Sequence, residues 1–232
     1  MINDADGEMV TFYRYVQHHP EALRAELARW PGNSRANFAT LRDNPGITDL
    51  QRAVRWYMLK VSSFCAQGRA WGRDRRNYYG YDPDRHWARI EALGRRLARV
   101  MVECGDWERV VEFYDGADTF HFFDPPYIAC EKTAYVPFTA EDMARVRARL
   151  DKLQGTWLLT CDDSPACREI FDGLPMQPMA IRYRLGNHAE RPKESGELLI
   201  MHPRLAPENL TTLEFTQKGS ARTAATSRTC GR

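Results

Sequence analysis

The chain has 232 residues, of which 43% are hydrophobic and 28% are charged, and its formal net charge is +2. This composition is ordinary for a soluble globular protein with one α/β domain and a sizeable core, and so small a net charge does not by itself indicate a nucleic-acid partner. The distribution of apolar residues excludes a membrane-spanning protein, because no apolar stretch approaches the roughly 20 residues that a span requires.

The cysteines and the amino terminus bear on the compartment. The six cysteines include no C-x-x-C pair, which argues against a structural zinc site. The first residues are acidic and polar and do not resemble a signal peptide. We therefore expect a cytoplasmic protein with free cysteines, no metal and no membrane partner.

Helical spacing dominates the first hundred residues. The elements expected there are a helix over 7–30 that breaks at Pro20, a loop over 31–45, a helix over 50–64, a glycine-, arginine- and aromatic-rich loop over 67–84, and an amphipathic helix from 86 that runs into a short strand ending near Cys104. Basic residues interleaved with aromatic ones, as in the 67–84 loop, can bind phosphates and stack on bases. A solvated arginine-rich loop with aromatic plugs fits the same pattern.

Strands alternate with helices in the second half of the chain. The expected elements are helices over 108–114, 139–153 and 163–171, and strands over 118–123, 156–161, 180–185 and 197–202. This alternation predicts a mainly parallel sheet in which 118–123 is a buried central strand, while the closing pair of strands is compatible with antiparallel pairing. From residue 206 the chain is rich in threonine, serine, alanine and arginine, so this basic tail is expected to be disordered.

An aromatic run followed by a proline turn is the most informative segment. The run at 120–123 leads directly into Asp124-Pro125-Pro126-Tyr127, which predicts a strand that stops at the sheet edge where open α/β sheets bind ligands. A flat base with an exocyclic amine fits this turn, because the amine can donate to Asp124 and to the Pro125 carbonyl while the ring stacks on Tyr127. The alternative is a turn in which Asp124 caps the next segment and Tyr127 packs in the core.

The D-P-P-Y turn and several other segments, in this order, resemble the phage-type branch of the DNA adenine methylase family, the N(6)-adenine-specific DNA methyltransferases. The segments that carry the resemblance are 2–6, 63–72, 102–107, 157–163 and 197–200, so that it covers residues 2–203. The resemblance implies an α/β fold of the S-adenosyl-L-methionine-dependent methyltransferases. In this fold a Rossmann-like sheet has helices on both faces. The resemblance also implies a catalytic domain over 1–30 and 101–205, interrupted by a helical target-recognition insertion over 31–100 and followed by the tail 206–232.

One departure from the family concerns its beginning. Members open with a lysine-containing segment and a first strand that ends in an F-x-G-x-G-type loop, which holds the methionine end of S-adenosylmethionine. Here only Met1, Ile2 and Asn3 precede Asp4, and the chain contains no G-x-G. The expectation is a catalytic domain truncated at its first strand. Three explanations remain open: the chain is a truncated form, another polypeptide supplies the piece, or the protein no longer catalyses.

The resemblance also implies cofactor and DNA contacts. Asp4 would accept the ribose hydroxyls of the cofactor, and Asp106 and Trp107 would bind its adenine. The alternative for Asp4 is a helix cap, which is the favoured role for the nearby Asp6. The alternative for Trp107 is a position in the core. The residues implied to contact DNA lie in the recognition segment and in the loop after the motif, and they are Arg69, Arg73, Arg75, Arg76, Lys132 and Tyr135.

The resemblance implies a site-specific DNA adenine methyltransferase. It would move a methyl group from S-adenosylmethionine to the exocyclic amine of an adenine flipped out of double-stranded DNA, with catalytic residues Asp124, Pro125, Pro126 and Tyr127. Two alternatives stay open. One is a catalytically inactive remnant that still binds DNA, and the other is an amino methyltransferase that acts on RNA or protein.

Overall fold

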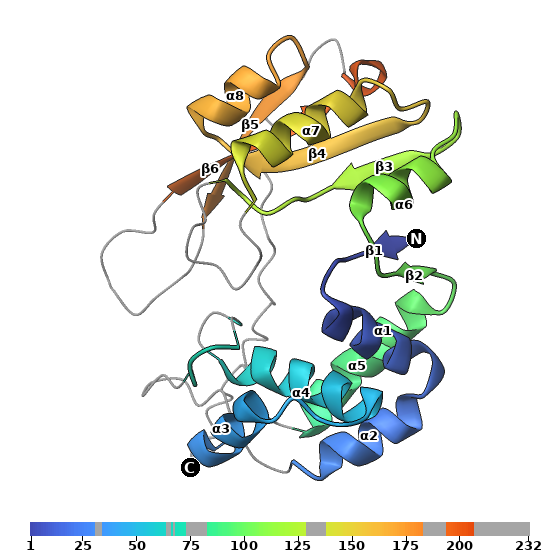
Figure 1. Cartoon of the computed structure of the whole chain (residues 1–232), viewed down its shortest axis with the longest axis vertical. Helices are drawn as coiled ribbons and strands as arrows, with labels where there is room; N and C mark the ends of the chain where they lie inside the picture. Colours follow the sequence, from blue (N-terminus) through green and yellow to red (C-terminus); the bar gives the residue numbers. More distant parts are fainter. Residues whose placement is uncertain are drawn as a thin grey trace, which may run out of the picture.

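The structure is a computed structural model, which describes residues 1–30, 34–63, 66, 68–72, 83–128, 138–182 and 194–206. Figure 1 shows a helical body, a sheet covered by helices, and a small pair of strands between them. The helices are α1 (Gly7–His18), α2 (Pro20–Ala28), α3 (Arg35–Asp43), α4 (Asp49–Ser62), α5 (Pro83–Leu97), α6 (Trp107–Tyr114), α7 (Ala140–Leu150), α8 (Pro165–Ile170) and the 3-10 turn η2 (Pro203–Leu205). The strands are β1 (Ile2–Asn3), β2 (Val102–Glu103), β3 (Phe120–Phe123), β4 (Thr156–Asp162), β5 (Met176–Arg182) and β6 (Glu194–Met201).

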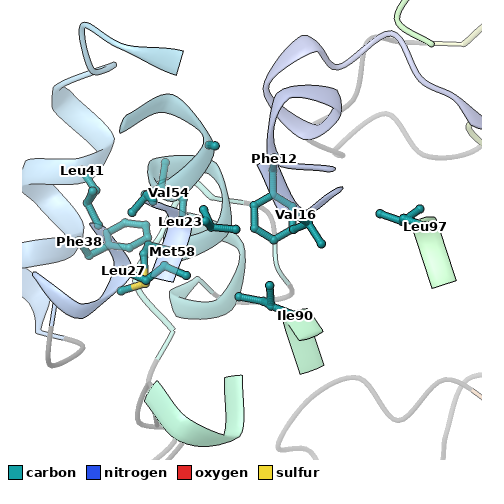
Figure 2. Close-up of a cluster of buried hydrophobic side chains, with 12 residues drawn as sticks. Phe12, Val16, Leu23, Leu27, Phe38, Leu41, Val54, Met58, Ile90 and Leu97 are labelled. Carbon is teal, nitrogen blue, oxygen red and sulfur yellow. The ribbon is translucent and has the colours of Figure 1, made fainter. Parts of the chain in front are cut away.

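The helical body has one apolar core, to which all five of the helices α1–α5 contribute (Figure 2). The predicted break at Pro20 is confirmed, since α1 ends at His18 and α2 begins at Pro20. Asp6 caps α1 by accepting the N–H groups of Glu8 and Met9, so the capping role expected for Asp6 is also confirmed.

The loop predicted over 31–45 is wrong over residues 35–43, where α3 forms. Ser34 accepts the N–H of Asn37 at 3.0 Å and so caps this helix. Phe38 and Leu41 lie one turn apart and are both buried in the core of the helical body. The serine cap and the two buried apolar side chains thus account for a helix that the polar composition of this segment did not predict.

The sheet is mixed, in contrast to the mainly parallel sheet that was predicted. Its order is β3-β4-β6-β5, with β3 parallel to β4, and β6 antiparallel to both β4 and β5. The expected antiparallel closing pair is confirmed, but its second strand lies between β4 and β5. A separate pair, β1 and β2, is parallel.

Among the described residues β3 pairs only with β4 and so lies at an edge of the sheet, where a buried central strand was predicted. His121 is buried and Phe123 is half-buried, whereas Phe120 and Phe122 on the opposite face are 54% and 59% exposed. A continuous aromatic run does not reveal this, because alternate residues of a strand point to opposite faces and their cover depends on distant segments.

One face of the sheet carries the second apolar core. Met143, Val146 and Leu150 of α7 pack there against Trp157 and Leu159 of β4. The other members and neighbours of this core lie on or beside α6, β3, β4, α8 and β6, and they include Trp107, Phe123, Cys161, Cys167, Phe171, Leu198 and Ile200. Within the described residues, the helices of the second half thus gather on one face, and the expected cover on both faces is not seen. Across all the described residues, no helix is long and apolar enough to cross a membrane.

Asp115 ties the end of α6 to two strands. Its carboxylate accepts the N–H groups of Gln154 and Gly155 at 2.9 and 3.1 Å and contacts Nε2 of His121 at 3.1 Å. Burial acts to raise the pKa of Asp115, but these three partners together hold it below its ordinary value. A carboxyl group with a depressed pKa stabilises the fold above its unfolded pKa of about 3.9, and that contribution is lost as the pH falls through the folded pKa.

Replacing Asp115 with Ala should lower the free energy of unfolding by about 1–3 kcal/mol at neutral pH, because the buried N–H of Gly155 loses its acceptor. Urea unfolding followed by tryptophan fluorescence measures this difference. Asp118→Ala, at an exposed carboxylate close by, is the matched control and should change little. The difference should shrink in acid, and a difference that persists there unchanged would contradict this role of Asp115.

Candidate active site

The D-P-P-Y turn leaves β3 at its carboxyl end and is held there by β4. Asp124 is exposed, and Pro125, Pro126 and Tyr127 are half-buried. The Thr160 hydroxyl lies 2.7 Å from Oδ1 of Asp124 and 3.4 Å from the carbonyl oxygen of Phe123. The geometry lets this hydroxyl donate to the carboxylate, which holds Asp124 at the carboxyl end of β3, and Oδ2 of Asp124 makes no hydrogen bond among the described residues.

The other end of the turn is held by Asp162, two residues further along β4. Its Oδ1 accepts the N–H of Ile128 at 3.2 Å, and the thiol of Cys167 lies 3.7 Å from the same oxygen. Asp162 is 8% exposed, and its Oδ2 is buried with no hydrogen bond among the described residues. Thr160 and Asp162 therefore fasten both ends of the D-P-P-Y turn to the neighbouring parallel strand.

Sequence reasoning did not assign a role to Thr160 or Asp162. The available signal was the run Thr160-Cys161-Asp162, which places two polar residues at alternate positions at the end of an apolar strand. In a parallel pair these positions lie beside the carboxyl end of the neighbouring strand, where the motif begins. The register that brings them there is a property of the folded sheet.

Asp4 lies at the carboxyl end of the small sheet. Its Oδ1 accepts the N–H of Asp6 at 2.7 Å, and no hydrogen bond is made by its Oδ2 within the described part of the chain. Asp6 is occupied otherwise, because it caps α1 and its Oδ2 accepts the indole N–H of Trp56 at 2.9 Å. Asp4 thus keeps a carboxylate oxygen for a ligand, whereas both oxygens of Asp6 have structural partners.

Asp106 and Trp107 follow β2, and the structure brings them to the same sheet edge as Asp4. The Asn3 side chain exchanges two hydrogen bonds with the backbone of Gly105, at 3.1 and 3.2 Å, and so joins the ends of β1 and β2. Asp106 caps α6 through Oδ1. Trp107 is half-buried, with its ring edge-on to Phe123 at 6.4 Å between centroids. Trp107 therefore has a packing role. The hydrogen bonds by which Asn3 joins β1 to the segment after β2 were not predicted from the sequence.

Arg69 is the one residue proposed to contact DNA that the structure describes. It is exposed on the segment between Ser63 and Trp71, which pair as an isolated antiparallel bridge. The Arg35 guanidinium lies 5.3 Å from the centre of the Trp71 ring, so this segment is attached to α3. The other proposed DNA contacts lie outside the described residues, and they are Arg73, Arg75, Arg76, Lys132 and Tyr135.

The described residues contain no group of three or more histidine, cysteine or acidic side chains that could hold a metal ion. The site therefore consists, as far as it is described, of two sets of side chains. One is the D-P-P-Y turn with Thr160 and Asp162, at the end of β3 and β4. The other is Asp4 with Asp106 and Trp107, at the end of β1 and β2.

Comparison with known proteins identifies similar sequences. The sequence model of the D12 class N6 adenine-specific DNA methyltransferases matches residues 1–177. The type II methyltransferase M1.LlaDCHI of Lactococcus lactis subsp. cremoris is 29% identical over an alignment of 194 positions, which covers 74% of this chain and 68% of that protein. The type II methyltransferase M.MjaIII of Methanocaldococcus jannaschii is 26% identical over an alignment of 124 positions, which covers 49% of this chain and 43% of that protein.

Proposed function

Because the chain belongs to the D12 class of N6 adenine-specific DNA methyltransferases, we propose that it methylates the exocyclic amine of adenine at specific sites in double-stranded DNA, with S-adenosylmethionine as the methyl donor. One observation carries the proposal. Asp124 stands exposed at the carboxyl end of β3, where the Thr160 hydroxyl contacts its carboxylate, three residues before Tyr127. The relatives named above are type II methyltransferases, so a role beside a restriction enzyme is the proposed biological setting.

The chemistry follows from the weakness of the nucleophile. The lone pair of the adenine amine is conjugated into the ring, so the nitrogen must become tetrahedral before it can attack a methyl group. Hydrogen bonds from the amine to Asp124 and to the Pro125 carbonyl favour that geometry. They strengthen as positive charge develops on the nitrogen, and so they bind the transition state better than the ground state.

Thr160 and Asp162 have a positioning role in this proposal. The Thr160 hydroxyl occupies Oδ1 of Asp124, which leaves the other oxygen to accept from the adenine amine. Asp162 holds the backbone at Ile128, and so fixes the direction in which the turn leaves Tyr127. A target base must be turned out of the duplex to reach this turn, and the Tyr127 ring supplies its stacking surface.

The proposed cofactor residues fit one part of S-adenosylmethionine. A free oxygen of Asp4 can accept a ribose hydroxyl, and Asp106 with Trp107 can bind the adenine by edge and by face. The donor supplies the transferable methyl group. No described residue is placed to hold its methionine end, which supports the proposal that the catalytic domain needs a first strand with an F-x-G-x-G-type loop. We use the name completed chain for this protein extended by such a strand and loop.

The proposed recognition region is 31–100, which contains α3, α4 and α5. It packs through one core on α1 and α2, so that a surface of this region is held firmly to the proposed catalytic part. Its proposed DNA contacts are four arginines of one segment, Arg69, Arg73, Arg75 and Arg76, and the loop after the motif adds Lys132 and Tyr135.

Replacing these four arginines together with Ala should weaken duplex DNA binding and flatten its salt dependence. The slope of log K against log salt should fall by about 0.9 for each phosphate contact that is lost. Fluorescence anisotropy with a labelled duplex over a salt series measures this. A matched variant that replaces four arginines of α5, Arg85, Arg89, Arg95 and Arg96, should leave the slope closer to that of the unaltered chain. An unchanged slope in the first variant would place the DNA surface elsewhere.

The proposed function is tested by the class of macromolecule that receives the methyl group. The completed chain is incubated with methyl-labelled S-adenosylmethionine and plasmid DNA, with total RNA and a protein mixture as parallel acceptors. We expect label in the DNA alone. Label in RNA or protein instead would contradict the proposal, and so would the absence of transfer by a completed chain that binds both S-adenosylmethionine and DNA, which would identify an inactive DNA-binding protein.

A further inference from the structure

Two neighbouring residues of α4, Arg55 and Trp56, reach the start of α1. The indole N–H of Trp56 donates to Oδ2 of Asp6 at 2.9 Å. The guanidinium of Arg55 donates to both carboxylate oxygens of Glu8, at 2.9 and 3.1 Å. Asp6 is the cap of α1, and Glu8 lies in its first turn. A helix of the proposed recognition region therefore holds both acids at the amino-terminal end of α1.

Arg55 is itself anchored on α3. Its Nε donates to the carbonyl of Leu41 at 2.6 Å and its Nη2 to that of Arg42 at 3.1 Å, both in the last turn of that helix. The Arg55 side chain is 17% exposed and the Glu8 side chain 35%, so the ion pair between them is partly shielded from solvent. Because the donors of a guanidinium form a rigid planar fork, Arg55 fixes α3, α4 and the first turn of α1 relative to one another.

The ring of Trp56 is held in the same way. It is half-buried and stacks on Phe12 of α1, with 5.4 Å between the ring centroids. The ammonium of Lys60 lies 5.6 Å from the centre of the ring. These contacts fix the plane of the indole, so that its N–H has one direction, toward Asp6.

Asp6 connects these contacts to Asp4. Its Oδ1 accepts the N–H groups of Glu8 and Met9, and its Oδ2 accepts the indole N–H of Trp56. With both carboxylate oxygens engaged, Asp6 is held in one orientation. Its own backbone N–H donates to Oδ1 of Asp4 at 2.7 Å, and Oδ2 of Asp4 makes no hydrogen bond within the described part of the chain. The direction of that second oxygen is therefore set by the bond to Asp6.

We infer that Arg55 and Trp56 are positioning residues for the ligand-binding oxygen of Asp4, and that they act through the first turn of α1. They contact no ligand themselves. The inference rests on the proposed function in one respect, the assignment of Asp4 to the ribose hydroxyls of the cofactor. It adds that α4 determines the affinity for the ribose, while the same helix leads at Ser63 into the segment that carries Arg69.

Adenosine is the probe that tests this on the chain as it stands, because it is the ribose and adenine part of the cofactor. Its affinity is measured by NMR titration of the backbone amide signals. The matched ligand is 2′,3′-dideoxyadenosine, which lacks the two hydroxyls that Asp4 would accept. A residue that positions Asp4 should affect the binding of adenosine and not the binding of dideoxyadenosine.

Trp56→Phe keeps an aromatic ring in the core and removes the N–H. It should weaken adenosine binding about three- to tenfold and leave dideoxyadenosine binding unchanged. The matched control is Trp87→Phe. Trp87 is also half-buried, its indole N–H donates to Glu91 at 2.8 Å, and the Arg24 guanidinium lies 5.2 Å from its ring centre, but the pair of Trp87 and Glu91 lies within α5. Trp87→Phe should leave both affinities unchanged.

Arg55→Lys keeps the charge and loses the fork, and it should give the same pattern as Trp56→Phe. Its control is Arg52→Lys, also on α4, where the arginine pairs only with the exposed Asp49 in the same helix. Equal weakening of both ligands by Trp56→Phe and Arg55→Lys, or weakening of neither, would overturn the inference.

Two further measurements show whether Trp56 acts through Asp4. In the Asp4→Ala protein, Trp56→Phe should cause no additional loss of adenosine affinity, and an additional loss would overturn the inference. Without ligand, the Asp6 amide should exchange at least about threefold faster in Trp56→Phe and be unaffected in Trp87→Phe, because its bond to Asp4 becomes intermittent.

The inference and the proposed function can fail separately. Faster exchange of the Asp6 amide in Trp56→Phe, in a chain that does not bind adenosine, would support the positioning of Asp4 and count against its assignment to the cofactor. Adenosine binding that depends on Asp4 but is unchanged by Trp56→Phe and Arg55→Lys would overturn the inference and leave the proposed function standing.

Discussion

Asp124→Ala in the completed chain should reduce the rate of methyl transfer by about 100- to 1000-fold, the range found when a group that stabilises developing charge is removed. The reason is that Asp124 accepts a hydrogen bond from the adenine amine, and this bond becomes stronger as the nitrogen becomes tetrahedral and positively charged. Single-turnover kinetics with saturating DNA and methyl-labelled cofactor measure the chemical step. The affinity for S-adenosylmethionine should stay within a few fold, because Asp124 contacts the target amine and not the body of the cofactor.

Two other variants serve as controls for this prediction. Asp4→Ala should show the opposite pattern, with a weaker cofactor affinity and a smaller effect on the chemical step. Thr160→Val removes the hydroxyl that orients Asp124 and should slow the chemical step, whereas Thr160→Ser keeps the hydroxyl and should restore most of the rate. Substantial activity in Asp124→Ala would contradict the role of the D-P-P-Y turn as an adenine pocket.

The isolated 232-residue chain should bind S-adenosylmethionine weakly or not at all. In the proposed function, Asp4, Asp106 and Trp107 hold the ribose and the adenine, and the family's F-x-G-x-G-type loop, which this sequence lacks, holds the charged methionine end. Each missing charge-assisted hydrogen bond is worth about 1.5–3 kcal/mol, so losing two of them lowers affinity by two orders of magnitude or more.

Isothermal titration calorimetry measures this affinity directly. The completed chain is the matched control and should bind at least about 100-fold more tightly than the isolated chain. Asp4→Ala in the completed chain should weaken binding again, which shows that the heat comes from the proposed site. A micromolar dissociation constant for the isolated chain would contradict the proposal that a loop of the F-x-G-x-G type is needed to hold the methionine end.

Most local elements of this protein could be predicted from its sequence, with α3 as an exception. The break between α1 and α2 follows from Pro20, which is a favourable first residue for a helix but interrupts a preceding one. The cap at Asp6 and the start of α7 at Thr139 follow from side chains that satisfy free N–H groups nearby in sequence. The D-P-P-Y turn was predicted at the end of a strand, and the structure places it at the carboxyl end of β3.

The long-range part of the fold and site could not be predicted in the same way. Thr160 meets Asp124 from 36 residues away, and their contact depends on the register of β3 against β4. The edge position of β3 depends on which strands pair with it, and its sequence of aromatic residues is equally suited to a central strand. The insertion of β6 between β4 and β5 likewise follows from tertiary packing, since no local pattern specifies strand order.

Nucleoside analysis of methylated DNA tests the central claim most directly. Plasmid DNA is treated with the completed chain and S-adenosylmethionine, digested to nucleosides, and examined by mass spectrometry against standards for each methylated base. We expect N6-methyldeoxyadenosine as the product, and its loss in a parallel reaction with Asp124→Ala. Methylated cytosine in place of methylated adenine, or an unchanged yield of N6-methyldeoxyadenosine from the Asp124→Ala protein, would contradict it.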